Sequence, residues 1–192
     1  MEVHVCDISD GAGVAARDTL VAQKKKHVIE LYGMSGGVTH MVAKILKEAE
    51  DSSSMIDKLV IWGHGGPGSQ GVSRGEESAR NADWAGIDIE NLLDRTSDGE
   101  EVKRRKKLMR NKLGELWNVL SYSAIVELHG CNVASTTIGQ MFLMALANIW
   151  EVPVRAGAVT QYGPSWSWAG AVHEARPGMS GTTTFQGSVK VL

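Results

Sequence analysis

Apolar residues in this chain form short runs that alternate with longer stretches of helical periodicity. The runs are typical of buried strands and cover residues 3–8, 27–32, 59–62, 124–128 and 152–159. Between them, apolar stripes repeat every three or four residues over 38–50, 100–120 and 137–150, as on one face of a helix. Strands that alternate with helices predict an α/β fold, with a mostly parallel sheet covered on both faces.

Other stretches carry turn signals. Residues 10–13 read Asp-Gly-Ala-Gly and predict a turn, and residues 14–26 end in three lysines, which indicates a solvated loop or short helix. Residues 182–192 alternate and predict a hairpin or an added edge strand. Among the helical stripes, we expect Val102 and Leu108, and later Ile138 and Met141, to face the core.

Length and composition describe one ordinary globular domain over residues 1–192, with a polar and helical insertion at about 72–120. The formal net charge of -2 gives no reason to expect nucleic acid or an anionic membrane as a partner. No apolar run approaches the roughly 18 residues of a membrane span. No signal peptide is visible, so we expect a cytoplasmic protein, with export by a route without a cleaved signal left open.

The two cysteines, Cys6 and Cys131, do not suggest a disulfide framework and fit a reducing compartment. His129 and Cys131 lie close in sequence, but the remaining ligands of a zinc site are missing. We therefore expect no metal and no cofactor.

Two of the strand-like runs end in a reactive side chain. His64 follows the run 59–62, and Cys131 follows the run 124–128. The carboxyl ends of parallel strands meet at one edge of a sheet, so we expect these two residues to arrive together. A thiol beside an imidazole is the minimum equipment for nucleophilic catalysis.

A serine hydrolase is the competing interpretation. Residues 33–37, Gly-Met-Ser-Gly-Gly, match the G-x-S-x-G nucleophile elbow around Ser35. Residues 64–68, His-Gly-Gly-Pro-Gly, look like the oxyanion-hole loop of some α/β-hydrolases, notably proline iminopeptidases. That fold places its oxyanion loop before the elbow, whereas here the order is reversed. We therefore rank the serine α/β-hydrolase last and interpret Ser35 as a polar residue in a glycine turn.

Residues 60–65, Val-Ile-Trp-Gly-His-Gly, and 127–134, Glu-Leu-His-Gly-Cys-Asn-Val-Ala, resemble the two motifs of caspase-like (clan CD) cysteine peptidases. In caspases, gingipains, clostripain, legumain and their bacterial relatives, a His-Gly ends one strand and a cysteine ends the next. The Gly-Cys-Asn-Val-Ala form resembles bacterial members in particular. The separation exceeds the roughly 50 residues of caspases, and the helical insertion around 100–120 accounts for the excess. The resemblance covers about residues 27–170.

The resemblance implies a three-layer α-β-α sandwich and a cysteine endopeptidase that acts on a protein or peptide substrate. Cys131 would be the nucleophile, and His64 the general base or proton donor. The backbone N–H groups of Gly65 and Cys131 would form the oxyanion hole. Ser165 and Trp166 resemble the caspase Ser-Trp-Arg segment of the substrate cleft, to which we add Trp168. The arginine of that segment and the caspase glutamine are missing, so aspartate specificity is not implied.

Two other functions stay open on the sequence: a non-catalytic caspase-like binding module, and a cysteine amidase that acts on a non-protein amide such as cell-wall peptide. A helix that opened at Cys131 would favour its thiolate through the positive helix end. We expect His129 to be packed or hydrogen-bonded rather than catalytic, and Glu127 to be its electrostatic neighbour. The sequence gives no indication of the cleavage preference, the activation mechanism or the oligomeric state.

Overall fold

The computed structural model describes the chain except for residues 10, 33–36, 73–85, 161–167 and 187–192. The helices are α1 (Gly11–Ala22), α2 (Gly37–Asp51), α3 (Glu100–Gly114) and α4 (Thr137–Trp150), with 3-10 turns η1 (Ile89–Asn91) and η2 (Glu115–Asn118). The central strands are β1 (Glu2–Asp7), β2 (Val28–Leu31), β3 (Ile56–Trp62), β7 (Leu120–His129), β8 (Val154–Gly157), β9 (Ala171–Ala175) and β10 (Thr183–Gln186). Three short strands, β4 (Gly65–Gly66), β5 (Ser69–Gly71) and β6 (Gly86–Asp88), form a second sheet.

The central sheet has seven strands in the order β10-β9-β8-β7-β3-β1-β2. Strands β1, β2, β3, β7 and β8 run parallel, and β9 and β10 add an antiparallel hairpin at one edge. The predicted α/β class and the mostly parallel sheet are thus confirmed. No helix in the described part of the chain is long and apolar enough to cross a membrane.

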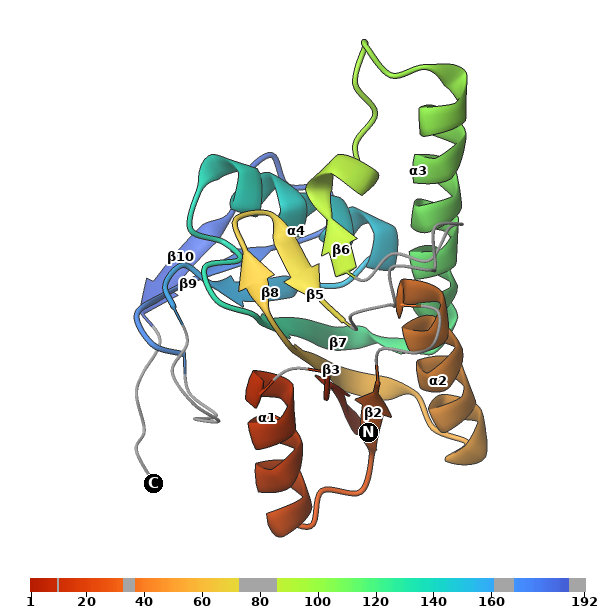
Figure 1. Cartoon of the computed structure of the whole chain (residues 1–192), viewed down its shortest axis with the longest axis vertical. Coiled ribbons are helices and arrows are strands. Elements are labelled where there is room, and N and C mark those ends of the chain that lie inside the picture. The colour runs from red at the N-terminus through yellow and green to blue at the C-terminus, as the bar shows by residue number, and fades with distance from the viewer. Residues whose placement is uncertain (10, 33–36, 73–85, 161–167, 187–192) are drawn as a thin grey trace.

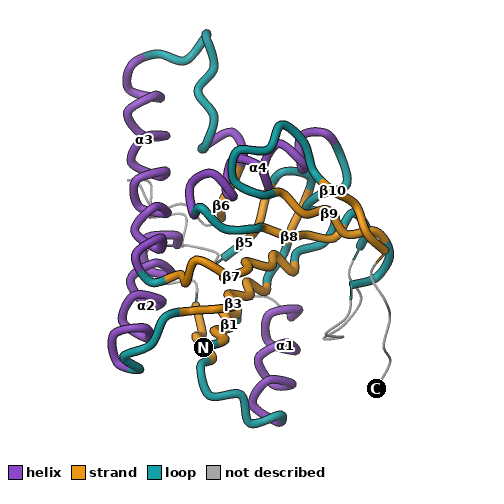
Figure 2. The backbone as a smooth tube through the Cα atoms, turned by 180° about the vertical axis from the view of Figure 1, so that it is seen from behind, coloured by secondary structure: helices purple, strands orange, loops and turns teal. Residues whose placement is uncertain are grey.

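Helices cover the two faces of the sheet unequally (Figure 1). On one face, α2, α3 and α4 pack over strand residues such as Leu59, Ile61 and Leu128. On the other face, α1 packs over Cys6 and Trp62, and it is the only described helix in contact with that side. Figure 2, seen from behind, shows α1 again separated from α2 and α3 by the sheet. The chain is therefore a three-layer α/β sandwich with one thin layer.

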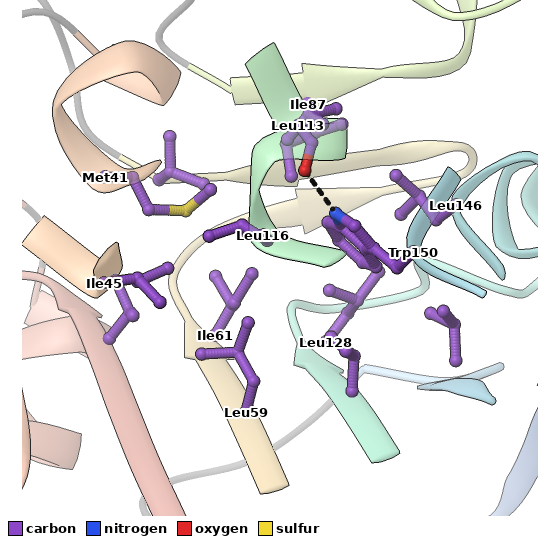
Figure 3. Close-up of a cluster of buried hydrophobic side chains, with 14 of the residues drawn as sticks. Met41, Ile45, Leu59, Ile61, Ile87, Leu113, Leu116, Leu128, Leu146 and Trp150 are labelled. Carbon is purple, nitrogen blue, oxygen red and sulfur yellow. Dashed lines mark hydrogen bonds between the residues drawn. The ribbon is translucent and has the colours of Figure 1, made fainter. Parts of the chain in front are cut away.

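The main core lies under α2, α3 and α4 (Figure 3). Trp150, at the end of α4, is fully buried and donates its indole N–H to the Leu113 carbonyl at 3.0 Å. This bond ties the end of α4 to the end of α3, because a buried indole N–H needs an acceptor. The two helices therefore form one platform for the strands β3 and β7.

Several local predictions were wrong for tertiary reasons. Gly11 and Gly13 belong to α1 instead of a turn; a Cβ on Gly13 would lie 1.8 Å from the Asp7 carbonyl oxygen, so glycine permits close packing there. The expected helix 100–120 ends at Gly114, and β7 already begins at Leu120. Four residues expected in the core are exposed, namely Val102, Leu108, Ile138 and Met141.

The carboxyl-terminal edge and the glycine-rich loop also differ from expectation. The strand predicted within 182–192 is confirmed as β10, but its partner β9 was not predicted. The loop at 64–71 folds as the β4–β5 hairpin, and β6 pairs with it. This small sheet stands on the α4 side of the main sheet (Figure 1).

Candidate active site

The strand order reverses direction between β1 and β3. The chain passes from β1 outward to β2, then returns across β1 to β3 and continues to β7 and β8. Ligands of open α/β sheets bind at such a switch point, beyond the carboxyl ends of the strands. A cavity of about 650 Å³ lies there, and its described lining includes Asp7, His64, Gly65, Gln70, Asp88 and Asn91.

His64 reaches this cavity from the loop after β3. Its side chain is exposed, while its backbone is held by the β4–β5 hairpin. The Gly71 N–H donates to the His64 carbonyl at 2.6 Å, and the fully buried Gln70 amide donates to the Gly71 carbonyl at 2.9 Å. The imidazole is therefore presented to solvent from a fixed backbone.

Cys131 lies in the loop after β7 and is half-buried. The next residue, Asn132, has a left-handed backbone (φ 58°), and its N–H donates to the Val159 carbonyl at 3.2 Å. The Ala134 N–H donates to the Gly157 carbonyl at 3.0 Å. Helix α4 begins only at Thr137, where the Thr136 side chain caps it. Cys131 therefore does not open this helix, since a separate turn at 131–134 comes between, and the condition for a thiolate favoured by the helix end is not met.

The His64 and Cys131 loops touch through glycine. Strands β3 and β7 are adjacent and parallel, with Trp62 opposite His129 in the register. A Cβ built on Gly65 would lie 2.7 Å from the Gly130 Cα and 2.7 Å from Val133 Cγ2. The two predicted residues thus leave the same edge of the sheet on loops that are in direct contact.

None of the other predicted site residues is found among the described residues that line the cavity. Ser165, Trp166 and the alternative nucleophile Ser35 lie outside the described residues. Trp168 is 8% exposed and stacks on His129, with ring centroids 4.1 Å apart. It is not among the described residues that line the cavity. Its ring stacks on His129, which in turn contacts Trp62 of the cluster under α1, and its role in substrate binding stays a prediction.

His129 is packed and hydrogen-bonded, as expected. Its Nε2 lies 3.1 Å from Glu127 Oε2, and the same oxygen lies 3.0 Å from Lys58 Nζ. Burial alone would raise the pKa of Glu127, but the bond to His129 and the nearby Lys58 outweigh it and lower that pKa to about 2. Burial lowers the pKa of His129, against the opposing effect of Glu127. The pair is therefore a carboxylate and a neutral imidazole at neutral pH.

Sequence reasoning missed Asp7 and Gln70. Asp7 ends β1, is 3% exposed, and accepts hydrogen bonds from the Ser9 backbone N–H at 3.1 Å and from the Ser9 hydroxyl. The sequence does place an acidic residue at the end of a predicted strand. Only the strand order, however, shows that this strand end lies beside His64. Gln70 had no signal, because its burial results from the β4–β5 hairpin.

In the described part of the chain, no three His, Cys, Asp or Glu side chains come together as metal ligands. A half-buried thiol and an exposed imidazole lie on touching loops beside a cavity. None of the protein-family models, curated proteins or solved structures compared with the chain matches it.

Proposed function

We propose that this chain is a cysteine peptidase of the caspase-like type, which hydrolyses peptide bonds with Cys131 and His64. The observation that carries the proposal is the contact between Gly65 and Gly130, which joins the loops after the neighbouring strands β3 and β7. An exposed imidazole beside a cavity at the switch point supports the same conclusion.

In the proposed reaction, the Cys131 thiolate attacks the carbonyl carbon of the scissile bond while His64 takes up the thiol proton. Backbone N–H groups of Gly65 and Cys131 would stabilise the oxyanion. His64 then donates the proton to the leaving amine, and a thioester with Cys131 remains. Water, activated by His64, releases the acid and restores the thiol.

The charge of the cavity favours a cationic substrate side chain. Asp7 and Asp88 line it, and its described lining contains no lysine or arginine. Asp88 also caps η1 by accepting from the Glu90 N–H at 2.7 Å, which leaves its second carboxylate oxygen for other donors. We propose that the cleaved peptide carries lysine or arginine next to the scissile bond.

A non-catalytic binding module is the second candidate. Cys131 is not among the described residues that line the cavity, although His64 is. A module that only binds would use the cavity and leave the thiol idle. A cysteine amidase would use the same two residues on a different amide.

A substrate-library digest with wild-type protein and the Cys131→Ala and His64→Ala variants tests the proposal. We expect cleavage by the wild type and its loss in both variants, with Cys6→Ala as the control because Cys6 is fully buried in another cluster. Cleavage that survives in Cys131→Ala would exclude the proposed nucleophile. Peptide binding without cleavage by the wild type would favour the binding module, and cleavage of cell-wall amides alone would favour the amidase.

A further inference from the structure

The residues two positions before His64 and Cys131 lie opposite each other on neighbouring strands. The chain reads Trp62-Gly63-His64 at the end of β3 and His129-Gly130-Cys131 at the end of β7. Trp62 and His129 are register partners, and their ring centroids lie 4.1 Å apart. Each loop therefore leaves the sheet directly beyond one member of this ring pair.

A third ring holds His129 from its other side. The Trp168 ring stacks on the imidazole with centroids 4.1 Å apart and planes at 20°. All three side chains are nearly excluded from solvent: Trp62 is 6% and Trp168 8% exposed, and the His129 side chain 5%. Stacked rings at this separation are in van der Waals contact, so the width of the imidazole sets the spacing.

Burial keeps His129 neutral against the opposing effect of Glu127, and its hydrogen bond to Glu127 holds the ring in one orientation. Glu127 on β7 accepts from its Nε2, and Lys58 on β3 pairs with the same carboxylate oxygen. Arg155 on β8 lies 4.0 Å from the other oxygen, and Glu2 on β1 lies 3.9 Å from the Lys58 Nζ. The charge of the Glu127 carboxylate is thus neutralised by Lys58 and Arg155. A neutral His129 imidazole with its proton on Nε2 can therefore donate the hydrogen bond that Glu127 accepts.

We propose that His129 is a positioning residue, whose ring between Trp62 and Trp168 fixes the spacing of the loops that carry His64 and Cys131. The inference rests on the proposed function, since it concerns how the two reactive residues are held together. The bond to Glu127 keeps the imidazole face-on to Trp168, and an imidazole turned edge-on would displace one of the two tryptophans.

A double-mutant cycle on the full chain separates positioning from plain structural support. The readout is the rate at which iodoacetamide alkylates Cys131 at pH 7, followed by peptide mass spectrometry, which needs no substrate. The effect of His64→Ala is measured in wild type, in His129→Gln and in His129→Phe. Glutamine can still bond Glu127 but has no ring, whereas phenylalanine keeps a ring and loses the bond. His27→Gln is the matched control, because His27 pairs with Glu48 at 2.8 Å before β2, at the opposite end of the strands.

In wild type and His27→Gln, removing His64 should slow alkylation about tenfold, because the neighbouring imidazole favours the thiolate. In His129→Gln that effect should fall below about twofold, and in His129→Phe most of it should remain. An undiminished effect in a folded His129→Gln protein would overturn the positioning role. No effect of His64→Ala in wild type would instead overturn the proposed pair itself.

If His129→Gln does not fold, Trp168→Leu removes the same stack from its outer side and should also weaken the His64 effect. Peptide cleavage provides a second readout, in which kcat should fall in His129→Gln and KM should change little. A merely structural role would lower the melting temperature and leave kcat unchanged well below that temperature.

Discussion

Gly65 and Gly130 lie so close that a Cβ built on either would be 2.7 Å from the Cα of the other. Real Cβ atoms do not approach a backbone carbon this closely, so neither residue tolerates a side chain unless the loops move apart. The contact lies between the residue after His64 and the residue before Cys131. It therefore limits how closely the loops that carry the His64 imidazole and the Cys131 thiol can approach each other.

Gly130→Ala should separate the two loops. We expect a loss of about 1–3 kcal/mol in the free energy of unfolding from overpacking, and a fall of about a hundredfold in peptide cleavage from misplaced reactive groups. Gly114→Ala is the control, because a Cβ there meets nothing within 4 Å and should stabilise α3 by about 0.5–1 kcal/mol. Thermal unfolding and cleavage rates measure both; full activity in Gly130→Ala would contradict the role of the contact.

The two cysteines should differ sharply toward thiol reagents. Cys6 is fully buried, and burial raises the pKa of its thiol to about 12. Cys131 is half-buried on an accessible loop. Iodoacetamide should therefore label Cys131 in the native protein and reach Cys6 only after denaturation, as peptide mass spectrometry would show. Labelling of Cys6 first would be the opposite of this expectation.

Asp7→Asn should change the substrate preference. The amide keeps an oxygen for the Ser9 N–H but removes the negative charge beside the cavity. We expect kcat/KM for peptides with lysine or arginine to fall about ten- to a hundredfold, the value of a charge-assisted hydrogen bond. Peptides with a neutral residue at that position should change little. Asp94→Asn, at an exposed ion pair with Arg110, is the matched control.

Acid should destabilise the fold in two ranges. Burial lowers the pKa of His4 from 6.5 to about 4, so the unfolded chain binds this proton first as the pH falls. Stability should therefore decline between pH 6.5 and 4, by at most about 3 kcal/mol from this residue. Glu127, with a pKa lowered from 4.5 to about 2, stabilises the fold above pH 4.5, and this contribution is lost below that pH.

Urea unfolding at a series of pH values measures this dependence. His4→Gln should flatten the curve between pH 6.5 and 4 without removing the loss below pH 4.5. A fold that becomes more stable on acidification from pH 6.5 to 4 would contradict the neutral, buried state of His4.

The pattern of apolar residues predicts an element correctly where that element buries one regular face. The predicted helix 137–150 coincides with α4, and the apolar runs at 59–62 and 124–128 lie within β3 and β7. It was a poor guide where packing decides the conformation. The glycines of α1 favour a turn locally, yet the close approach of Asp7 to Gly13 places them in a helix.

The pattern of residues along the chain is enough to predict alternating strands and helices, and a histidine and a cysteine that each follow a strand. Both facts are local, because strand and helix periods can be counted along the chain. Folding is needed to bring Asp7 into the cavity of His64, Gly65 against Gly130, and His129 between two tryptophans. These relations depend on the order and register of strands far apart in sequence, which no local pattern encodes.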